Sequence, residues 1–176
     1  NMRHVMKDQE TFLRAARLTR AAVPDSGFIL AGEGEQTEGL RGLATELGLA
    51  DRAFFIGRCR RIADLLAISD VCVLSSKGVE GFSNSILEYM AASRPVVATD
   101  VGGAREAVID GETGHIVRPE DFEIMAQRII SLLREPERAR AMGQRGRRLV
   151  EDRFSCQTQL RRIEELYQKL LSHESV

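Results

Sequence analysis

The sequence has few residues of the kinds that build metal sites or disulfide frameworks. It contains three cysteines and three histidines in 176 residues, and these are widely dispersed along the chain. Zinc sites need such residues at short, regular spacings, so the sequence predicts no metal site. We expect Cys59, Cys72 and Cys156 to be buried as small hydrophobic side chains, and His115, on an expected short strand, to pack or to face solvent.

Long apolar runs and an excess of one charge are also missing. No run approaches the roughly 18 apolar residues that a membrane span requires, and the beginning lacks the layout of a signal peptide. The net charge is −1, from 25 basic and 26 acidic residues of mixed order. There is no basic stripe for nucleic acid and no acidic tail. We therefore expect a reduced, cytoplasmic protein that does not bind nucleic acid.

Neither a repeat, a low-complexity tract nor a linker interrupts the chain. A chain of this length forms one domain, here residues 1–176, and buries roughly 70% of the surface that its unfolded form exposes. Its first residues look like the loop leaving a strand that is not present. We expect from this that the domain belongs to a longer protein.

Short apolar runs alternate with segments of helical periodicity. The predicted strands are 28–31, 54–56, 71–74, 95–99 and 115–117. Asp8 can cap the first helix, and from Asp121 onward the chain reads as helical. Strands of this length separated by helices indicate βαβ crossovers and a parallel sheet, so the fold class is α/β. The unbroken apolar run 28–31 favours a strand buried on both faces.

Ligands of open parallel sheets bind beyond the carboxyl ends of the strands, so the residues after each apolar run are candidates. The richest such segment is 75–88. Gly78 and Gly81 precede a helix that Ser83 or Asn84 can cap, and the free amides of a helix start bind phosphate. Two carboxylates bracket that start, and carboxylates accept hydrogen bonds from vicinal sugar hydroxyls. The spacing fits equally well a capped surface helix with two solvated glutamates.

The segment from Glu80 to Glu88 resembles the E-x7-E motif of glycosyltransferase family 4, usually written EGFG…LEAMA. Further segments resemble family elements in the family's order, and together they cover essentially the whole chain. These are 3–8 (the R…K element), 32–34, 55–57 (F-x-G), 89–99, 102–106 and 110–114. The resemblance implies a Rossmann-like, three-layer domain, the C-terminal half of a GT-B fold, with the N-terminal acceptor domain absent.

The resemblance also implies a role for each matching residue. Glu80 would contact the transferred sugar and Glu88 the ribose diol, while the amides of Gly81, Phe82 and Ser83 meet the phosphates or the sugar. Arg3 and Lys7 would neutralise the diphosphate, and would act with Glu80 as the catalytic residues. Arg58 would border the base, and Gly32 lies in the binding loop after the preceding strand. Ser93 replaces a usual glycine.

The implied function is a retaining glycosyltransferase that moves a hexosyl group from a nucleoside-diphosphate sugar to an acceptor hydroxyl. Neither a metal nor another cofactor is implied, and we expect residues 1–176 to be inactive without the acceptor domain. Any membrane contact, at the inner face, would come through that domain. The alternatives are a non-catalytic nucleotide-sugar-binding domain and a GT-B sugar-nucleotide epimerase; no pyridoxal-binding segment of the phosphorylase kind is present.

Overall fold

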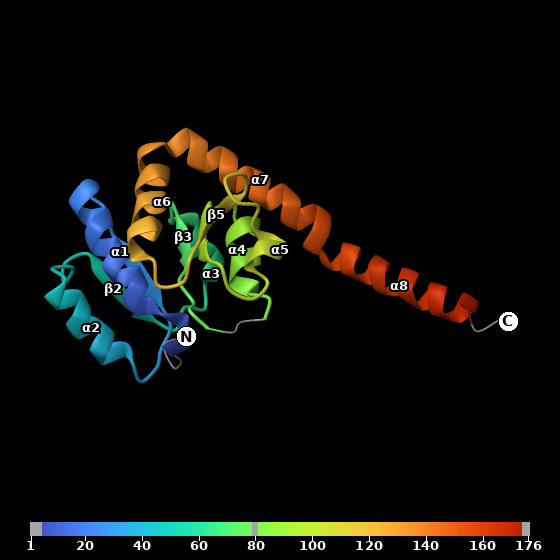
Figure 1. The fold of residues 1–176 in the computed structure, drawn as a ribbon, viewed down its shortest axis with the longest axis horizontal. Helices are drawn as coiled ribbons and strands as arrows, with labels where there is room; N and C mark the ends of the chain where they lie inside the picture. The colour runs from blue at the N-terminus through green and yellow to red at the C-terminus, as the bar shows by residue number, and fades with distance from the viewer. Residues whose placement is uncertain (1–4, 79–80, 174–176) are drawn as a thin grey trace.

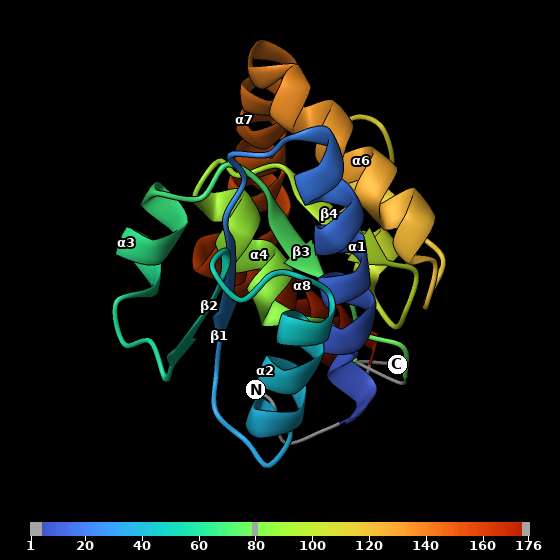
Figure 2. The same cartoon turned by 90° about the vertical axis from the view of Figure 1, so that its left-hand side faces the viewer.

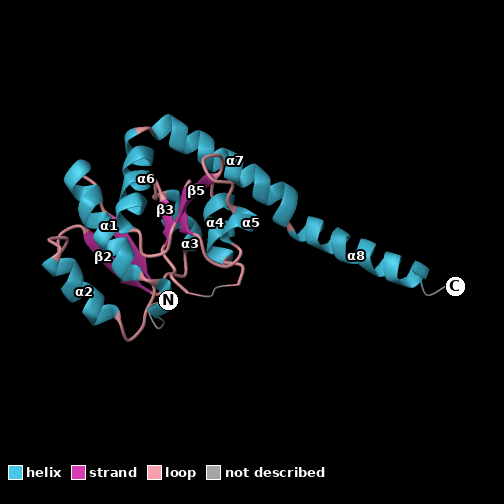
Figure 3. Ribbon diagram, viewed as in Figure 1, coloured by secondary structure: helices cyan, strands magenta, loops and turns pink. Residues whose placement is uncertain are grey.

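The computed structural model describes residues 5–78 and 81–173. Figures 1 and 3 show helices packed around short strands, with one long helix extending away from the rest. In chain order the elements are a 3-10 turn (Val5–Lys7), α1 (Gln9–Ala22), β1 (Phe28–Ala31), α2 (Thr37–Glu46), β2 (Ala53–Gly57), α3 (Ile62–Ala67), β3 (Cys72–Leu74), α4 (Asn84–Ala91), β4 (Val96–Thr99), α5 (Ala104–Ala107), β5 (Gly114–Val117), α6 (Phe122–Arg134), α7 (Pro136–Phe154) and α8 (Cys156–His173).

All strand pairs are parallel, as the alternation of strands and helices predicts, but the strands form two sheets. β1 pairs with β2, and β3, β4 and β5 follow one another in a separate sheet. Each connection between paired strands contains a helix, because a parallel neighbour can be reached only by crossing back over the sheet. Within the described residues, β1 and β3 each have one edge without a strand neighbour.

Helices cover both faces of the strands and give three layers, which confirms the expected α/β class. α1 and α2 pack Leu13 and Leu40 against Phe28 and Leu30 of β1. α6 joins α1 on this side and covers the three-stranded sheet, where Met125 and other side chains of α6 meet β4 and β5. Figure 2 shows α1 and α6 on one side of the strands and α3 on the other.

The opposite face of the three-stranded sheet is covered by α4, α5 and α7. Ile86 and Met90 of α4 and Val150 of α7 pack against Val96 and other residues of the sheet. Successive residues of β4 therefore pack alternately against the helices on the two faces of the sheet, and all four residues are buried. This is the pattern of a strand covered on both faces.

The expectation that β1 is buried on both faces is wrong. Phe28 and Leu30 are buried under α1 and α2, but Ile29 is 38% exposed. On the neighbouring strand, Phe54 and Ile56 are exposed as well. The cause is the covering layer: the short helix α3 leaves this face of the two-stranded sheet largely open, whereas α4, α5 and α7 cover the same face of the other sheet.

The cysteines are free, but they are not uniformly buried as expected. Cys72 on β3 is buried, Cys59 is half-buried, and Cys156 is exposed at the start of α8. Position in the fold explains this difference. Cys72 lies in a strand between helical layers, whereas Cys156 lies on a helix whose main packing partner in the described part of the chain is α7. In the described part of the chain, no helix is both long and apolar enough to cross a membrane.

Candidate functional site

The start of α1 is held by a buried aspartate. Asp8 occupies the N-cap position in a left-handed conformation (φ 42°), and its carboxylate accepts hydrogen bonds from the backbone N–H of Thr11 (3.4 Å) and from the Thr11 hydroxyl (2.7 Å). Such a cap satisfies N–H groups that have no partner inside the helix. It confirms the expected cap and fixes the direction in which the preceding residue, Lys7, leaves the 3-10 turn.

The loop after β3 is joined to this turn by hydrogen bonds. The Lys77 N–H donates to the Met6 carbonyl (2.8 Å), and the Ser75 hydroxyl donates to the Lys7 carbonyl (3.0 Å). The Lys77 ammonium also lies 3.9 Å from Asp8 Oδ1 and 3.5 Å from Glu120 Oε1. Segments far apart in sequence are thus brought to the carboxyl end of β3.

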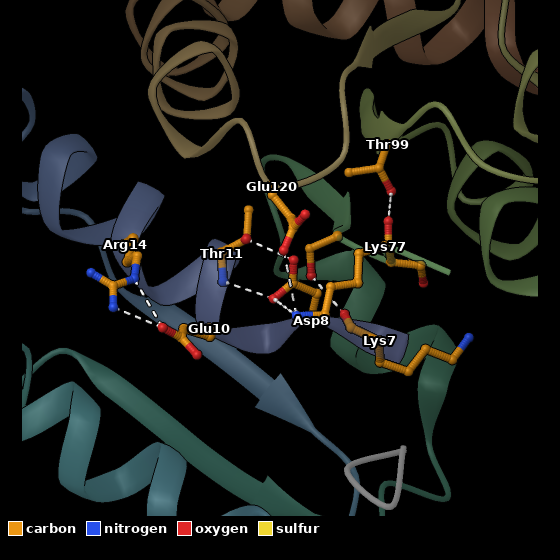
Figure 4. A network of polar contacts seen from close by, with 10 residues as sticks. Lys7, Asp8, Glu10, Thr11, Arg14, Lys77, Thr99 and Glu120 are labelled. Carbon is orange, nitrogen blue, oxygen red and sulfur yellow. Dashed lines mark hydrogen bonds and ion pairs between the residues drawn. The ribbon is translucent and has the colours of Figure 1, made fainter. Parts of the chain in front are cut away.

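A second hydrogen-bonded group fixes the residues that follow β3. The buried Thr99 hydroxyl, at the end of β4, lies within hydrogen-bonding distance of the Ser76 carbonyl (2.5 Å) and of the Leu74 carbonyl (3.3 Å). Figure 4 shows the contact of Thr99 with the loop after β3 together with the cluster around Asp8, and it shows the Lys7 side chain extending away from that cluster. Hydrogen bonds therefore hold the backbone around Lys7 in place, while the Lys7 ammonium group points away from the cluster around Asp8.

Lys7 and Glu88, both singled out from the sequence, line one cavity of about 520 Å³. The cavity lies against β1 and β3 and also includes Ser75 and Ser85 in its wall. Lys7 is half-buried and Glu88 is exposed. A cation and a carboxylate in the wall of one cavity can bind a ligand that carries both phosphate and hydroxyl groups.

The other predicted residues of the helix start lie beside this cavity, not in its wall. Ser83 is the N-cap residue of α4, as the sequence indicates, but its side chain makes no capping hydrogen bond. The Phe82 ring packs on Phe154 of α7 with centroids 5.2 Å apart. The carbonyl of Gly81 accepts a hydrogen bond from the Gly103 N–H (3.2 Å), which ties the loop to the residues after β4.

Gly32 and Arg58, also predicted, are brought together at the carboxyl ends of β1 and β2. The Gly32 N–H donates to the Gly57 carbonyl (2.7 Å), and the Glu33 carboxylate accepts from the Arg58 N–H (3.2 Å). Gly57 has φ +63°, a conformation that side-chain-bearing residues rarely adopt. These two residues form a second group at the same edge, separate from the wall that Lys7 and Glu88 share.

Arg3 and Glu80 lie outside the described residues, so their predicted positions stay predictions. The sequence reading missed the pairing of Lys77 with Asp8 and the link that Glu33 makes to Arg58. A signal for Lys77 was present, since it follows the strand ending in Ser75 and Ser76. The sequence does not identify Asp8 as the partner of Lys77, because the two residues are far apart in the chain and Asp8 also fits a capping role alone.

Two titratable groups near the strands have displaced pKa values. The Arg105 guanidinium hydrogen-bonds Asp100 directly after β4, at 2.7 and 2.8 Å, and holds the pKa of that carboxyl below its usual value. Burial, assisted by the positive charge of Arg128, lowers the pKa of His115 on β5. The His115 Nε2 is buried and has no hydrogen-bond partner among the residues that the structure describes, which favours the neutral imidazole.

The chain is similar in sequence to known glycosyltransferases. The family described as glycosyl transferases group 1 matches residues 2–149. The chain belongs to this family. It is 38% identical over 160 residues to the putative glycosyltransferase EpsD of Bacillus subtilis, covering 91% of this chain and 41% of that protein. It is 32% identical over 171 residues to the N-acetyl-alpha-D-glucosaminyl L-malate synthase of Bacillus anthracis, covering 97% and 44%.

Solved structures of glycosyltransferases share the fold. Anabaena Alr3699/HepE, crystallised in complex with UDP, superposes with a TM-score of 0.89 at 26% identity, covering 96% of this chain and 47% of that one. The C-terminal domain of the group 1 protein LpcC of Francisella tularensis superposes with a TM-score of 0.79 at 26% identity, covering 87% and 82%. The chain thus spans less than half the length of the two curated relatives and most of the LpcC domain.

Proposed function

We propose that residues 1–176 form the donor-binding half of a retaining glycosyltransferase of family 4, which transfers a hexosyl group from a nucleoside-diphosphate sugar to an acceptor hydroxyl. The observation that carries the proposal is the shared cavity wall of Lys7 and Glu88. Support comes from the family match and from the similarity to HepE, whose structures hold UDP and UDP-glucose.

In this proposal Lys7 binds the diphosphate and Glu88 accepts hydrogen bonds from the ribose hydroxyls. The amides at the start of α4, from Gly81 to Ser83, meet the phosphates or the sugar, since a helix start carries free N–H groups and positive partial charge. Arg58 borders the base, and Gly32 belongs to the donor-binding loop after β1. Glu80 contacts the transferred sugar.

The chemistry needs a group that stabilises a leaving anion. When the bond between the anomeric carbon and the diphosphate oxygen breaks, its electron pair stays on the diphosphate. In this proposal Arg3, Lys7 and the α4 amides stabilise the negative charge where it grows, which is where a preorganised site lowers the barrier most. The acceptor oxygen then bonds to the anomeric carbon on the face from which the diphosphate leaves, and the proton of the acceptor hydroxyl passes to an oxygen of the leaving diphosphate. We propose that this set of cations and amides needs no divalent metal and no other cofactor.

We assign acceptor binding to a second, N-terminal domain. Support comes from the length of the curated relatives, since the chain covers only 41% and 44% of them. Holding two reactants in a productive geometry is worth roughly 7–11 kcal/mol of a barrier. Residues 1–176 should therefore bind donor without transferring its sugar at an appreciable rate. Any attachment to the inner face of a membrane would likewise come through the N-terminal domain.

The decisive experiment is calorimetric titration of the chain with UDP, GDP, ADP and their hexose conjugates, with and without a metal chelator. Lys7→Ala should weaken diphosphate binding by about 1–3 kcal/mol, roughly 5- to 150-fold, because it removes a charge-assisted contact. Glu88→Gln should weaken nucleotide and nucleotide-sugar alike. The chelator should change neither affinity.

Two control variants distinguish the loss of a contact at the site from the general effect of removing one charge. Lys169→Ala removes a cation from the exposed helix α8, and Glu123→Gln removes a carboxylate from the first turn of α6. Neither should change the affinity for a diphosphate. Equal losses in Lys7→Ala and Lys169→Ala would place the phosphate elsewhere and overturn the proposal.

A further inference from the structure

Lys77 contacts the residues on both sides of Lys7 in the chain. The Lys77 N–H donates to the Met6 carbonyl (2.8 Å), and the Lys77 ammonium lies 3.9 Å from Asp8 Oδ1. Between these two residues, the Lys7 carbonyl accepts a hydrogen bond from the Ser75 hydroxyl (3.0 Å). The backbone that carries Lys7 is therefore joined to the loop after β3 at three successive residues, and Lys77 makes the first and the last of these contacts.

The residue after Lys77 packs against the same turn. A β-carbon built on Gly78 would overlap the Sδ and Cε atoms of Met6, so the methionine side chain lies directly against the glycine. Glycine permits this close approach because it has no side chain. Lys77 thus lies where the loop that leads to α4 meets the turn that carries Lys7.

The Lys77 ammonium also reaches a third segment of the chain. It lies 3.5 Å from Oε1 of Glu120, which stands between β5 and α6. Asp8 is the N-cap residue of α1, and Glu120 directly precedes Asp121, the N-cap residue of α6. Figure 4 shows Lys77 beside the carboxylates of Asp8 and Glu120. One cation therefore joins the residues before α1, after β3 and before α6.

Both carboxylate partners of Lys77 have left-handed backbone conformations. The φ angle is 42° at Asp8 and 63° at Glu120, and in the described part of the chain the only other such residue besides glycines is Ser93. These conformations cost free energy and persist where surrounding contacts hold them, often at functional sites. The two carboxylates are already stabilised by the free N–H groups and dipoles of the helix starts. A cation that joins them is therefore placed to fix the geometry of this edge rather than to neutralise its carboxylates.

We propose that Lys77 is a positioning residue of the donor site, an inference that rests on the proposed function. Its ammonium bridges Asp8 and Glu120, and this bridge holds the backbone of Lys7 so that the Lys7 ammonium reaches the diphosphate. Lys77 does not contact the donor in this arrangement. It lines a separate hollow of about 370 Å³ that also includes Asp8, whereas Lys7 and Ser75 line the 520 Å³ cavity.

Of the two bridged carboxylates, Asp8 contributes more to this positioning. The side chain of Asp8 is 3% exposed and that of Glu120 is 69% exposed. Solvent and salt screen an exposed ion pair much more than a buried one. The contact between Lys77 and Asp8 is therefore the one to remove first.

The test removes the charge on either side of this contact and keeps the shape of the side chain. Lys77→Met keeps an unbranched chain without the ammonium. Asp8→Asn keeps an oxygen that can cap α1, and asparagine tolerates the left-handed conformation. Lys77→Arg restores a cation, and Lys169→Met on α8 is the matched control.

Affinity is measured by calorimetry with UDP, GDP and ADP. Lys77→Met and Asp8→Asn should weaken the diphosphate that the parent chain binds by roughly 3- to 10-fold. Lys77→Arg should recover most of this loss, and Lys169→Met should show none. An unchanged affinity in Lys77→Met, with or without a lower melting temperature, would leave Lys77 a role in stability alone and overturn the inference.

A second background separates positioning from direct contact with the phosphates. Because Lys77 acts through Lys7, Lys77→Met should change the affinity of the Lys7→Ala protein by less than about twofold. A loss of the same size in both backgrounds would mean that the Lys77 ammonium binds the phosphates itself, and the positioning role would be wrong.

Amide hydrogen exchange tests the bridge without a ligand. The amide of residue 77 donates to the Met6 carbonyl, so it should exchange roughly 3- to 10-fold faster in Lys77→Met and Asp8→Asn than in the parent chain. The Cys72 amide, which donates to Pro95 within the sheet, should not change. If the parent chain binds a diphosphate but residue 77 exchanges equally in all variants, only this inference fails. If the parent binds none of the three nucleotides, the proposed function fails and this inference fails with it.

Discussion

Helix α7 crosses the end of α4 at a point where the chain has a glycine, Gly143. A β-carbon built on Gly143 would lie 2.0 Å from the carbonyl oxygen of Ser93 and 2.7 Å from its carbonyl carbon. These are backbone atoms, and they cannot rotate away as the end of a flexible side chain can. Replacing Gly143 with alanine therefore forces α7 away from α4, which carries Glu88 of the candidate site.

The magnitude follows from the displacement that the methyl group requires. Contacts below 3.0 Å are essentially never observed for β-carbons, so α7 must move by about 1 Å. Inserting a methyl group into a packed interface without space costs about 1–3 kcal/mol. Alanine in a helix interior gains up to about 1 kcal/mol over glycine, which offsets part of this loss. We expect Gly143→Ala to lower the free energy of unfolding by roughly 1–2 kcal/mol.

Two other glycines provide the comparison that the measurement needs. At Gly42, in α2, a β-carbon would meet no atom within 4 Å, so Gly42→Ala should stabilise the protein by up to about 1 kcal/mol. At Gly146, in α7, the nearest atom would lie 3.4 Å away, so Gly146→Ala should fall between the two. Urea denaturation followed by circular dichroism ranks the three variants. A Gly143→Ala protein as stable as Gly42→Ala would refute the close crossing of α7 and α4.

Three further predictions concern single residues. Ser93 has φ 57°, a conformation that side chains disfavour, so Ser93→Gly should raise the free energy of unfolding by roughly 0.5–1 kcal/mol in the same urea assay. A thiol reagent should modify exposed Cys156 quickly and spare buried Cys72, whose pKa burial raises to about 12; peptide mass mapping that finds both labelled equally would contradict this. Because the pKa of His115 is lowered in the fold, the unfolded chain binds more protons below about pH 6.5 and stability should fall there. His115→Gln should flatten that dependence in melts across pH, and an unchanged slope would exclude His115 as its source.

The sequence was most informative where a local pattern determines the structure. The run 28–31 is a strand with the predicted bounds, and Asp8 caps α1 as expected. Apolar runs of four residues ending in glycine or serine are short-range signals that need no knowledge of the rest of the chain. The short helix α5 was missed, because four residues are too few to show a helical period.

Local sequence patterns did not predict the division of the strands into two sheets or the exposure of Ile29. Both depend on which elements lie beside a strand, and a strand's own residues do not specify its neighbours. For the site, the position after an expected strand singled out Lys7, the helical pattern placed Glu88 in the second turn of the helix after the loop, and family resemblance assigned their roles. Their common cavity is a tertiary fact, as is the pairing of Lys77 with Asp8.

Helix α8 has a mechanical consequence that follows from how it is attached. It continues from α7 through Ser155, whose backbone is extended, and it projects away from the layered body (Figure 1). Its 18 residues at about 1.5 Å each give an arm roughly 27 Å long. Leu166, Tyr167 and Leu170 are more than half exposed along it. A rotation of about 10° at Ser155 would swing the far end of this arm by about 5 Å without disturbing the packing of the helices on the two sheets. Small changes in the backbone torsions of one residue therefore set where the arm's apolar side chains point.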